Sequence, residues 1–390
     1  MATAYPPAGQ PSQPMTLGVR LHRFWRRVTE GLEVSQLWSQ FETEARASYR
    51  LYARDVEAKT PEGLTRRGRH LHVIKEFFWA VFEKLSPARR VLLLAALIML
   101  VLPRAGFNFE GQNGKVYVGE FDLHFWGGLL LLILLILEIG DRVVMKRDLQ
   151  IAREIQTWLL PGAPPQIPGL SLAYATRPAN TVAGDYYDVF PRPAAQTPGS
   201  EYLIVIADVA GKSVPAAMLM ATFQASLKTL AATASSLTEL VGRMNNYACG
   251  NSQNGRRFTT TFIAEYDPGS RALNYVNAGH NPPILRRQTG AVERLTAGGI
   301  PLGIRQDAAY HSGAVSLEGG DWLVIFTDGV TEAENAHADE YGEARLMTVL
   351  AANLAAGPQA LLNQIMLDLD RFAGDAPQHD DITLLLLKAV

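Results

Sequence analysis

Four acidic residues that border short apolar runs constrain the fold of this chain more than any other feature. Asp208 and Asp328 each follow such a run, Asp380 precedes one, and Asp185 lies in the glycine-containing stretch 183–188. Apolar runs of this length are typical of buried strands. If the strands lie side by side, their ends gather the carboxylates into a small volume, where repulsion is costly unless a cation neutralises it. The pattern therefore predicts a site for hard divalent metal ions.

Length and composition bound the number of domains and the class of partner. With 390 residues, 48% of them hydrophobic, the chain exceeds one ordinary domain and can bury a large core, so we expect two parts. The net charge of −2 argues against a global attraction to nucleic acid, and no nucleic-acid partner is expected. The single cysteine, Cys249, excludes an internal disulfide and a zinc site with several thiolates; we expect it to be a small buried residue.

The N-terminal quarter divides into two regions. Residues 1–20 are rich in Pro, Ala, Gln and Ser, and this composition predicts a disordered tail. Residues 21–90 carry apolar residues at helical spacing among many arginines, which predicts two or three amphipathic helices. The pattern does not indicate what these helices do.

Residues 91–140 contain two apolar segments, 91–102 and 125–137, each shorter than the ~20 residues of an ordinary membrane span. Residues 1–90 hold 15 Lys and Arg against 9 Asp and Glu, whereas the joining stretch is acidic and four basic residues follow the second segment. This asymmetry predicts a two-span hairpin in the inner membrane with both ends, and hence the C-terminal part of the chain, in the cytoplasm. The alternative is a soluble pair of core helices.

A linker helix is predicted over 141–160. Val144, Ile151, Ile155 and Trp158 fall on one helical stripe that stops at Pro161. The stripe fits either a plain amphipathic linker or a seam through which two copies form a homodimer.

Residues 161–390 differ in pattern from the preceding part of the chain. Short strand-like runs alternate there with turn signals, and helical stretches interrupt them. Asp267 to Ser270 separates two such runs and predicts a hairpin connection. Strand clusters separated by helix pairs predict a layered α+β domain with antiparallel sheets. The helices are expected over 215–232, 237–249, 343–354 and 358–372.

A series of short motifs in this part resembles the SpoIIE/RsbU-type serine/threonine phosphatases, a bacterial branch of the PP2C-like, metal-dependent PPM family. The motifs occur in the family's order over some 230 residues, so the match is strong although each fragment alone is weak. They are Leu159-Leu160-Pro161, Arg177-Pro178-Ala179, Gly184-Asp185-Tyr186-Tyr187-Asp188, Asp208-Val209-Ala210-Gly211-Lys212, Ala216-Ala217, Asn277-Ala278-Gly279-His280-Asn281-Pro282-Pro283, Pro301-Leu302-Gly303, Thr327-Asp328-Gly329-Val330-Thr331-Glu332 and Asp380-Asp381-Ile382-Thr383.

The resemblance implies a β-sandwich flanked by helices with a centre of two Mn²⁺ or Mg²⁺ ions. It implies that Asp208 bridges the ions, that Asp185 and the Val209 carbonyl serve one, and that Asp328 and Asp380 serve the other. The donor chemistry agrees, since hard cations favour carboxylate, carbonyl and water, and no Cys or His cluster competes for a softer ion.

Four further residues of the motifs have open roles. Asp188 and Asp381 are expected to be structural or to support neighbouring ligands. Arg177, in the substrate-side motif, either touches phosphate or forms a structural ion pair. His280 either protonates the leaving serine oxygen or fixes a loop by hydrogen bonding, and the flanking Gly and Asn-Pro favour the loop.

Two positions depart from the family pattern. Ala183 stands where the first of two glycines is common, and Ser213 stands where a glycine follows the lysine. Both residues are small and neither replaces an implied ligand, but they are expected to strain a turn.

Together these features predict a membrane-anchored, metal-dependent phosphatase that acts on phosphoserine or phosphothreonine in a protein. By resemblance, the substrate is a phosphorylated anti-sigma-factor antagonist of the STAS class, in bacterial signal transduction. The alternative is a non-catalytic signalling scaffold that keeps the fold, although a scaffold has no need of four convergent carboxylates.

Overall fold

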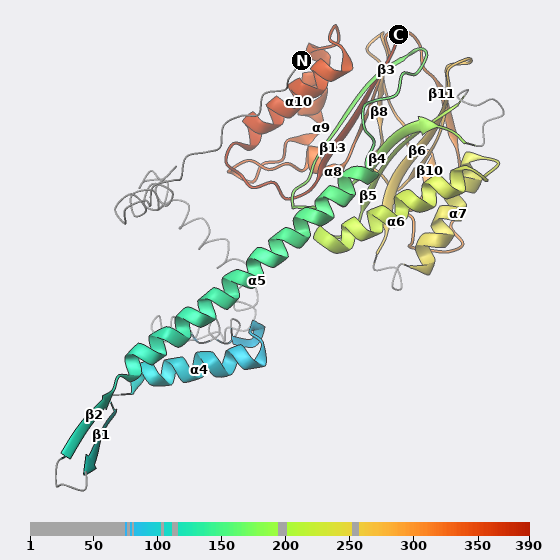
Figure 1. The fold of residues 1–390 in the computed structure, drawn as a ribbon. Helices are drawn as coiled ribbons and strands as arrows, with labels where there is room; N and C mark the ends of the chain where they lie inside the picture. The colour runs from blue at the N-terminus through green and yellow to red at the C-terminus, as the bar shows by residue number, and fades with distance from the viewer. Residues whose placement is uncertain are drawn as a thin grey trace, which may run out of the picture. The chain divides into compact units, whose positions relative to one another are not determined.

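The computed structural model describes residues 75, 79, 82–102, 105–110, 116–193, 201–251 and 257–390, with backbone alone for 105–110 and 116–121. The predicted tail and most of the predicted helices in 21–90 lie outside these residues. The chain divides into two compact units, Met1–Ile139 and Gly140–Val390. Figure 1 shows the elements of both, although it does not place one unit relative to the other.

The first unit contains helix α4 (Pro87–Val101), an antiparallel hairpin of β1 (Ala105–Glu110) and β2 (Val116–Phe121), and the start of α5 (Leu123–Leu159). Pro87 occupies the first turn of α4, where its missing N–H costs nothing. Gly127 of α5 packs against α4, because a Cβ there would lie 3.0 Å from the Ala96 carbonyl oxygen.

The predicted membrane hairpin is not supported by this unit. Within the described residues, every helix is too short or too polar to cross a membrane. Helix α4 has 15 residues, fewer than the ~20 that a span needs, and the second apolar segment is the first part of a 37-residue helix. That helix, α5, continues through the charged stretch after Ile139 and includes nearly all of the linker helix predicted over 141–160. It ends at Leu159, two residues before Pro161.

The second unit is built around two mainly antiparallel sheets. One has the strand order β10-β7-β6-β5-β4 with β11 also paired to β7, and the other has the order β3-β13-β12-β8-β9. The strands of the first sheet are β4 (Tyr186–Pro191), β5 (Tyr202–Val209), β6 (Thr259–Asp267), β7 (Ala272–Ala278), β10 (Gly298–Gly299) and β11 (Gly313–Ser316). Those of the second are β3 (Leu170–Arg177), β8 (Ile284–Arg286), β9 (Val292–Arg294), β12 (Trp322–Phe326) and β13 (Ile382–Ala389).

Helices cover the outer faces of both sheets (Figure 1). Buried side chains of α6 (Ser213–Ala231) and α7 (Leu237–Gly250) form one core with the first sheet. Those of α9 (Gly342–Ala352) and α10 (Pro358–Ala373) form another with the second sheet. The predicted helix pairs and the predicted β-sandwich flanked by helices are thereby confirmed.

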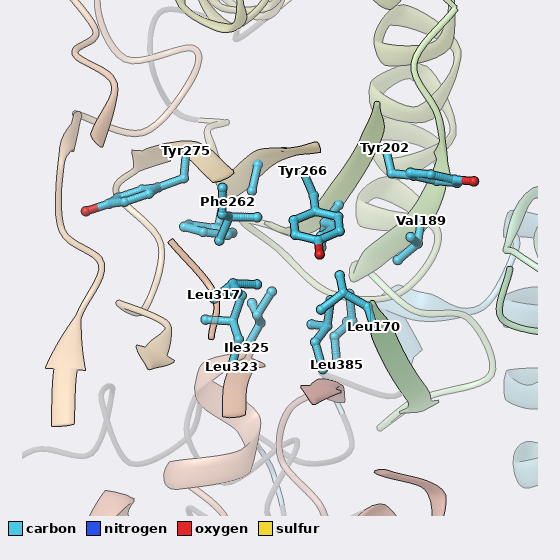
Figure 2. Close-up of a cluster of buried hydrophobic side chains, with 14 of the residues drawn as sticks. Leu170, Val189, Tyr202, Phe262, Tyr266, Tyr275, Leu317, Leu323, Ile325 and Leu385 are labelled. Carbon is cyan, nitrogen blue, oxygen red and sulfur yellow. The ribbon is translucent and has the colours of Figure 1, made fainter. Parts of the chain in front are cut away.

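A third core lies between the sheets. Figure 2 shows Phe262 and Tyr266 of the first sheet facing Ile325 and Leu385 of the second. Alternate residues of β5 divide between two cores, since Ile204 packs between the sheets while its neighbours pack beneath α6 and α7. Each fully buried aliphatic or aromatic side chain stabilises the fold by about 1.5–3 kcal/mol. Burial on both faces explains why these strands are continuous apolar runs rather than alternating ones.

Strand pairing brings the four acidic positions to one edge of the sandwich. In the first sheet, the start of β4 pairs with the end of β5, with Tyr186 opposite Ala207. In the second, the end of β12 pairs with the start of β13, with Phe326 opposite Leu384. Asp185 therefore lies beside the end of β5, and the residues after β12 lie beside those before β13.

Candidate metal centre

Asp208, near the end of β5, lies at the centre of an acidic neighbourhood. Burial and the charges of Asp328, Asp380, Asp381 and Glu332 raise the pKa of its carboxyl to about 7. These four residues come from two separate stretches of the chain, 328–332 and 380–381, and all of them act on one carboxylate. The ionised form of Asp208 is therefore destabilised at neutral pH unless a cation compensates it.

Asp185, directly before β4, is buried and held by two hydroxyl groups. Thr327 Oγ1 donates to its Oδ2 at 2.9 Å, and Thr383 Oγ1 donates to the same oxygen at 2.6 Å. Burial, and next the charge of Asp208, raise the pKa of Asp185 well above its usual range, although the two hydroxyl bonds oppose that rise. The threonines thus link the candidate ligand of one sheet to the second sheet and fix the orientation of its carboxylate.

Two glycines allow the stretches that carry the acids to approach each other. A Cβ on Gly184 would lie 3.2 Å from the carbonyl oxygen of Val209 and 3.3 Å from Ala216. A Cβ on Gly329 would lie 2.1 Å from the carbonyl oxygen of Asp381, closer than atoms can approach. The absence of a side chain at these two positions is therefore what lets the loops close over the edge of the sandwich.

Asp328 and Asp380 form the second-sheet side of the site. Asp328 begins the short helix α8 (Asp328–Thr331), and burial, followed by the charge of Asp380, raises its pKa. The charge of Lys212 opposes this rise. Asp380 Oδ2 lies 3.2 Å from Lys212 Nζ, and its Oδ1 accepts a hydrogen bond from the N–H of Asp381 at 2.9 Å.

Asp381 anchors a loop with both carboxylate oxygens. Its Oδ1 accepts from the N–H of Ala179 at 2.7 Å, and its Oδ2 accepts from the N–H of Gly184 at 2.6 Å. Burial raises its pKa, while these backbone bonds lower it. Asp381 thus holds the backbone directly before Asp185 in place and supports a candidate ligand. Of the two adjacent aspartates, Asp380 is the one whose carboxylate lies against Lys212.

His280 follows β7 and is buried beneath the candidate ligands. Its ring Nδ1 is 3.0 Å from the hydroxyl of Thr260, the residue opposite Asp208 in the sheet, and its backbone N–H donates to Asn277 Oδ1 at 2.8 Å. Burial lowers the pKa of the imidazole to about 4. A neutral imidazole is a very weak acid and donates a proton poorly to a leaving group at pH 7. The lowered pKa and the two hydrogen bonds therefore favour the role of fixing a loop.

Asp188 and Arg177 have other partners. Asp188 Oδ2 accepts from the hydroxyl of Tyr186 at 2.8 Å and lies 2.6 Å from Lys228 Nζ. Arg177 Nη1 donates to Asp370 at 2.5 Å on the surface. Asp188 thus belongs to an ion pair between β4 and α6, whereas Arg177 lies on the rim of a cleft that leads to Asp380.

The donor set suits hard divalent ions. As the side chains stand, no three His, Cys, Asp or Glu residues of the described part are close enough together to hold a metal ion. Burial, and next the charge of a neighbouring aspartate, raise the pKa values of Asp185, Asp208 and Asp328, so a cation would stabilise the ionised form of each. The donors are carboxylates and the carbonyl of Val209, the oxygen ligands that Mg²⁺ and Mn²⁺ prefer. The residues present therefore fit such ions.

Comparison with known proteins identifies the family of this chain. A family model described as Stage II sporulation protein E (SpoIIE) matches residues 198–390. The phosphoserine phosphatase RsbU of Bacillus subtilis is 30% identical over 252 residues, which cover 64% of this chain and 72% of RsbU. The chain belongs to the SpoIIE/RsbU family of bacterial serine phosphatases.

Two further matches extend over the same part of this family member. Protein IcfG of Synechocystis is 28% identical over 269 residues, which cover 62% of this chain but 41% of IcfG. The chain thus spans less than half of that relative. The SiaA-PP2C domain of Pseudomonas aeruginosa superposes with a TM-score of 0.55 at 20% identity, over 64% of this chain and 98% of that domain. This likeness establishes the PP2C-like α+β fold.

Several residues that organise the family's site in this chain were not predicted from its sequence. Thr327 and Thr383 stand in the motifs quoted above, but no role was predicted for them. Thr327 directly follows the apolar strand β12 and Thr383 is a polar residue within β13, a signal that could have identified both. Gln156 of α5 is buried and makes two bonds to Ala183: its Nε2 donates to the carbonyl oxygen at 2.7 Å and its Oε1 accepts from the N–H at 2.9 Å. Two hydrogen bonds from α5 thus fix the backbone of the loop that carries Asp185.

Of the two departures from the family pattern, Ser213 is strained. Its φ is 62°, in the left-handed region that favours glycine. Ala183 is buried and hydrogen-bonded to Gln156, and its φ is negative, as is usual for residues other than glycine. The expected strain therefore occurs at Ser213.

Proposed function

We propose that this protein hydrolyses phosphoserine or phosphothreonine on a protein substrate, with two Mn²⁺ or Mg²⁺ ions as cofactors. The observation that carries the proposal is the buried position of Asp208 among other acids. Burial first, and then the charges of those acids, raise its pKa to about 7, so a compensating cation would stabilise its ionised form. Family membership supports the reaction, since RsbU is named a phosphoserine phosphatase.

The residues would divide the work as follows. Asp208, the most surrounded carboxylate, would lie between the ions; Asp185 and the Val209 carbonyl would hold one, and Asp328 and Asp380 the other. When bound, the ions would supply polarisation of the phosphoryl oxygens and a water of lowered pKa. The hydroxyls of the two threonines hold Oδ2 of Asp185 in one orientation, and the other carboxylate oxygen would then bind the ion.

A cleft beside Asp380 would admit the phosphorylated side chain. Its volume is about 460 Å³, and it is lined by Arg177, Lys212, Glu332 and His379 among others. We propose a phosphorylated anti-sigma-factor antagonist of the STAS class as the substrate. The similarity to RsbU supports this choice, which is narrower than the reaction itself.

Release of phosphate from a panel of phosphorylated regulatory proteins tests the function, with Mn²⁺ present or chelated. Turnover that requires Mn²⁺ and is lost in Asp208→Ala is expected. Unchanged turnover by that variant contradicts the proposed centre. The matched control is Asp307→Ala, which removes a highly exposed carboxylate from a surface pair with Arg305.

A scaffold without activity is the competing function, and it is distinguished by calorimetry. A scaffold predicts no saturable binding of Mn²⁺, whereas the proposed enzyme predicts saturable binding to the wild type and weaker binding to Asp208→Ala.

Attachment to the inner membrane and dimerisation through α5 complete the proposal. Exposed apolar side chains support attachment: Val101 is 84% exposed and Phe125 64% exposed. Trp158, 79% exposed, and Ile155 lie on the outer stripe of α5 and support a dimer seam. Recovery of the full chain in the soluble fraction after lysis without detergent would contradict attachment, and a monomer in sedimentation would contradict the seam.

A further inference from the structure

Lys212 lies directly against one of the candidate metal ligands. Its Nζ is 3.2 Å from Asp380 Oδ2 and donates to the carbonyl oxygen of His379 at 2.6 Å. Asp380 is 168 positions away in the sequence, so the tertiary structure creates this contact. The side chain of Lys212 is 57% exposed, and its outer part faces the cleft beside Asp380.

The backbone on both sides of Lys212 is in an unusual conformation. Gly211 has a φ of 121° and Ser213 a φ of 62°, and Lys212 itself is the extended residue before α6. A left-handed conformation at a residue other than glycine costs roughly 1–2 kcal/mol. Such strain persists where the surrounding structure determines the conformation, and it often occurs at functional sites. The turn holds the lysine between the end of β5 and the loop of Asp380.

The two permanently charged cations that line the cleft in the described part of the chain have different partners. Arg177 is paired with Asp370, a surface carboxylate outside the candidate centre. Lys212 is paired with Asp380, which the proposed function assigns to an ion. A divalent cation and an ammonium group compete for the same carboxylate oxygen, so ion binding to Asp380 removes the carboxylate partner of Lys212 and leaves its bond to the His379 carbonyl oxygen.

We propose that Lys212 binds the phosphoryl group of the substrate and exchanges Asp380 for a phosphoryl oxygen when Asp380 binds an ion. This inference rests on the proposed function. The four candidate aspartates carry four negative charges, which two divalent ions balance. Asp381 and Glu332 add further negative charge around Asp208, so a phosphate monoester needs a cation beside it. Lys212 supplies that positive charge, and the N–H donors of its ammonium group suit the phosphate oxygens.

The exchange predicts effects of opposite sign on two ligands. Lys212→Gln removes the competitor for Asp380, so Mn²⁺ is expected to bind the metal-free protein several-fold more tightly. The same variant lacks the charge that faces phosphate, so inorganic phosphate is expected to bind the Mn²⁺-saturated protein roughly tenfold more weakly, the effect of one charge-assisted hydrogen bond. A residue that served only to support the fold would weaken both.

Calorimetry on the full chain measures both affinities, first with Mn²⁺ and then with inorganic phosphate in saturating Mn²⁺. Lys212→Arg keeps the charge and is expected to retain phosphate affinity within about threefold, a margin of about 0.7 kcal/mol. Lys228→Gln is the matched control, because Lys228 also pairs with an aspartate, Asp188, and is not among the residues that line the cleft. It is expected to leave both affinities unchanged.

The outcomes separate this inference from the function on which it rests. If the wild type binds Mn²⁺ and releases phosphate, but Lys212→Gln binds inorganic phosphate as the wild type does, the inference fails and the function stands. If the variant weakens Mn²⁺ and phosphate binding together, Lys212 has a structural role and the inference also fails. A wild type that neither binds Mn²⁺ nor releases phosphate overturns both.

Discussion

Replacing Asp208 with asparagine should stabilise the metal-free protein while it abolishes activity. The carboxyl pKa rises from 3.8 to about 7 because the side chain is buried among other acids. A group whose pKa is raised by folding contributes stability below its unfolded pKa and loses that contribution as the pH rises through its folded pKa. Between about pH 4 and pH 7, therefore, ionisation of Asp208 progressively destabilises the native state.

The size of the effect follows from the same pKa values. At about 1.4 kcal/mol for each pKa unit, the ionised Asp208 costs the native state about 4 kcal/mol at pH 8. Asparagine has a similar shape and no charge, so it should recover about 2 to 4 kcal/mol, less the cost of burying its amide. Bound Mn²⁺ should stabilise the wild type and have little effect on the variant.

Urea unfolding at pH 8 with a chelator, repeated with Mn²⁺, measures both effects. Asp208→Asn should unfold at higher urea than the wild type in chelator, and the order should reverse with Mn²⁺. The control Asp307→Asn should follow the wild type in both. A variant that is no more stable than the wild type in chelator would show that the acids around Asp208 do not repel it, and the argument for a cation site would fail.

Three further substitutions test the supports of the site. Burial lowers the pKa of His280 to about 4, so the native state binds fewer protons than the unfolded state as the pH falls below 7. The difference in the free energy of unfolding between the wild type and His280→Asn should therefore decrease by about 3 kcal/mol from pH 7 to pH 4. A difference in urea unfolding that stays constant over this range would contradict the prediction. Gly329→Ala should cost at least about 2 kcal/mol in the same assay, because its Cβ would overlap the Asp381 carbonyl oxygen; wild-type stability would refute the close approach. Gln156→Leu should leave the backbone N–H and carbonyl oxygen of Ala183 unpaired and lower the free energy of unfolding by about 2 kcal/mol. It should also lower Mn²⁺-dependent turnover. Turnover equal to that of the wild type would mean that α5 does not position the loop that carries Asp185.

The local elements and the membership of the acidic group were predictable from the sequence. The helix predicted over 215–232 is α6 at Ser213–Ala231, and the hairpin predicted around Asp267 connects β6 to β7. Such elements are encoded by spacing and turn residues within a few positions of each other. The apolar segments in 91–140 carried no such decisive signal, because runs of 12 or 13 residues suit several structures.

Which polar atoms meet was decided by the tertiary structure alone. The sequence around Asp185 does not indicate its bonds to Thr327 and Thr383, because Thr327 directly follows β12 and Thr383 lies in β13, both in the opposite sheet. The pairing of Lys212 with Asp380 likewise depends on a strained turn that no local pattern specifies. The sequence by itself determined that acids would end buried strands and that the strands would form a sandwich. Packing of the two sheets decided which oxygen faces which partner, since that geometry depends on contacts between segments more than a hundred residues apart.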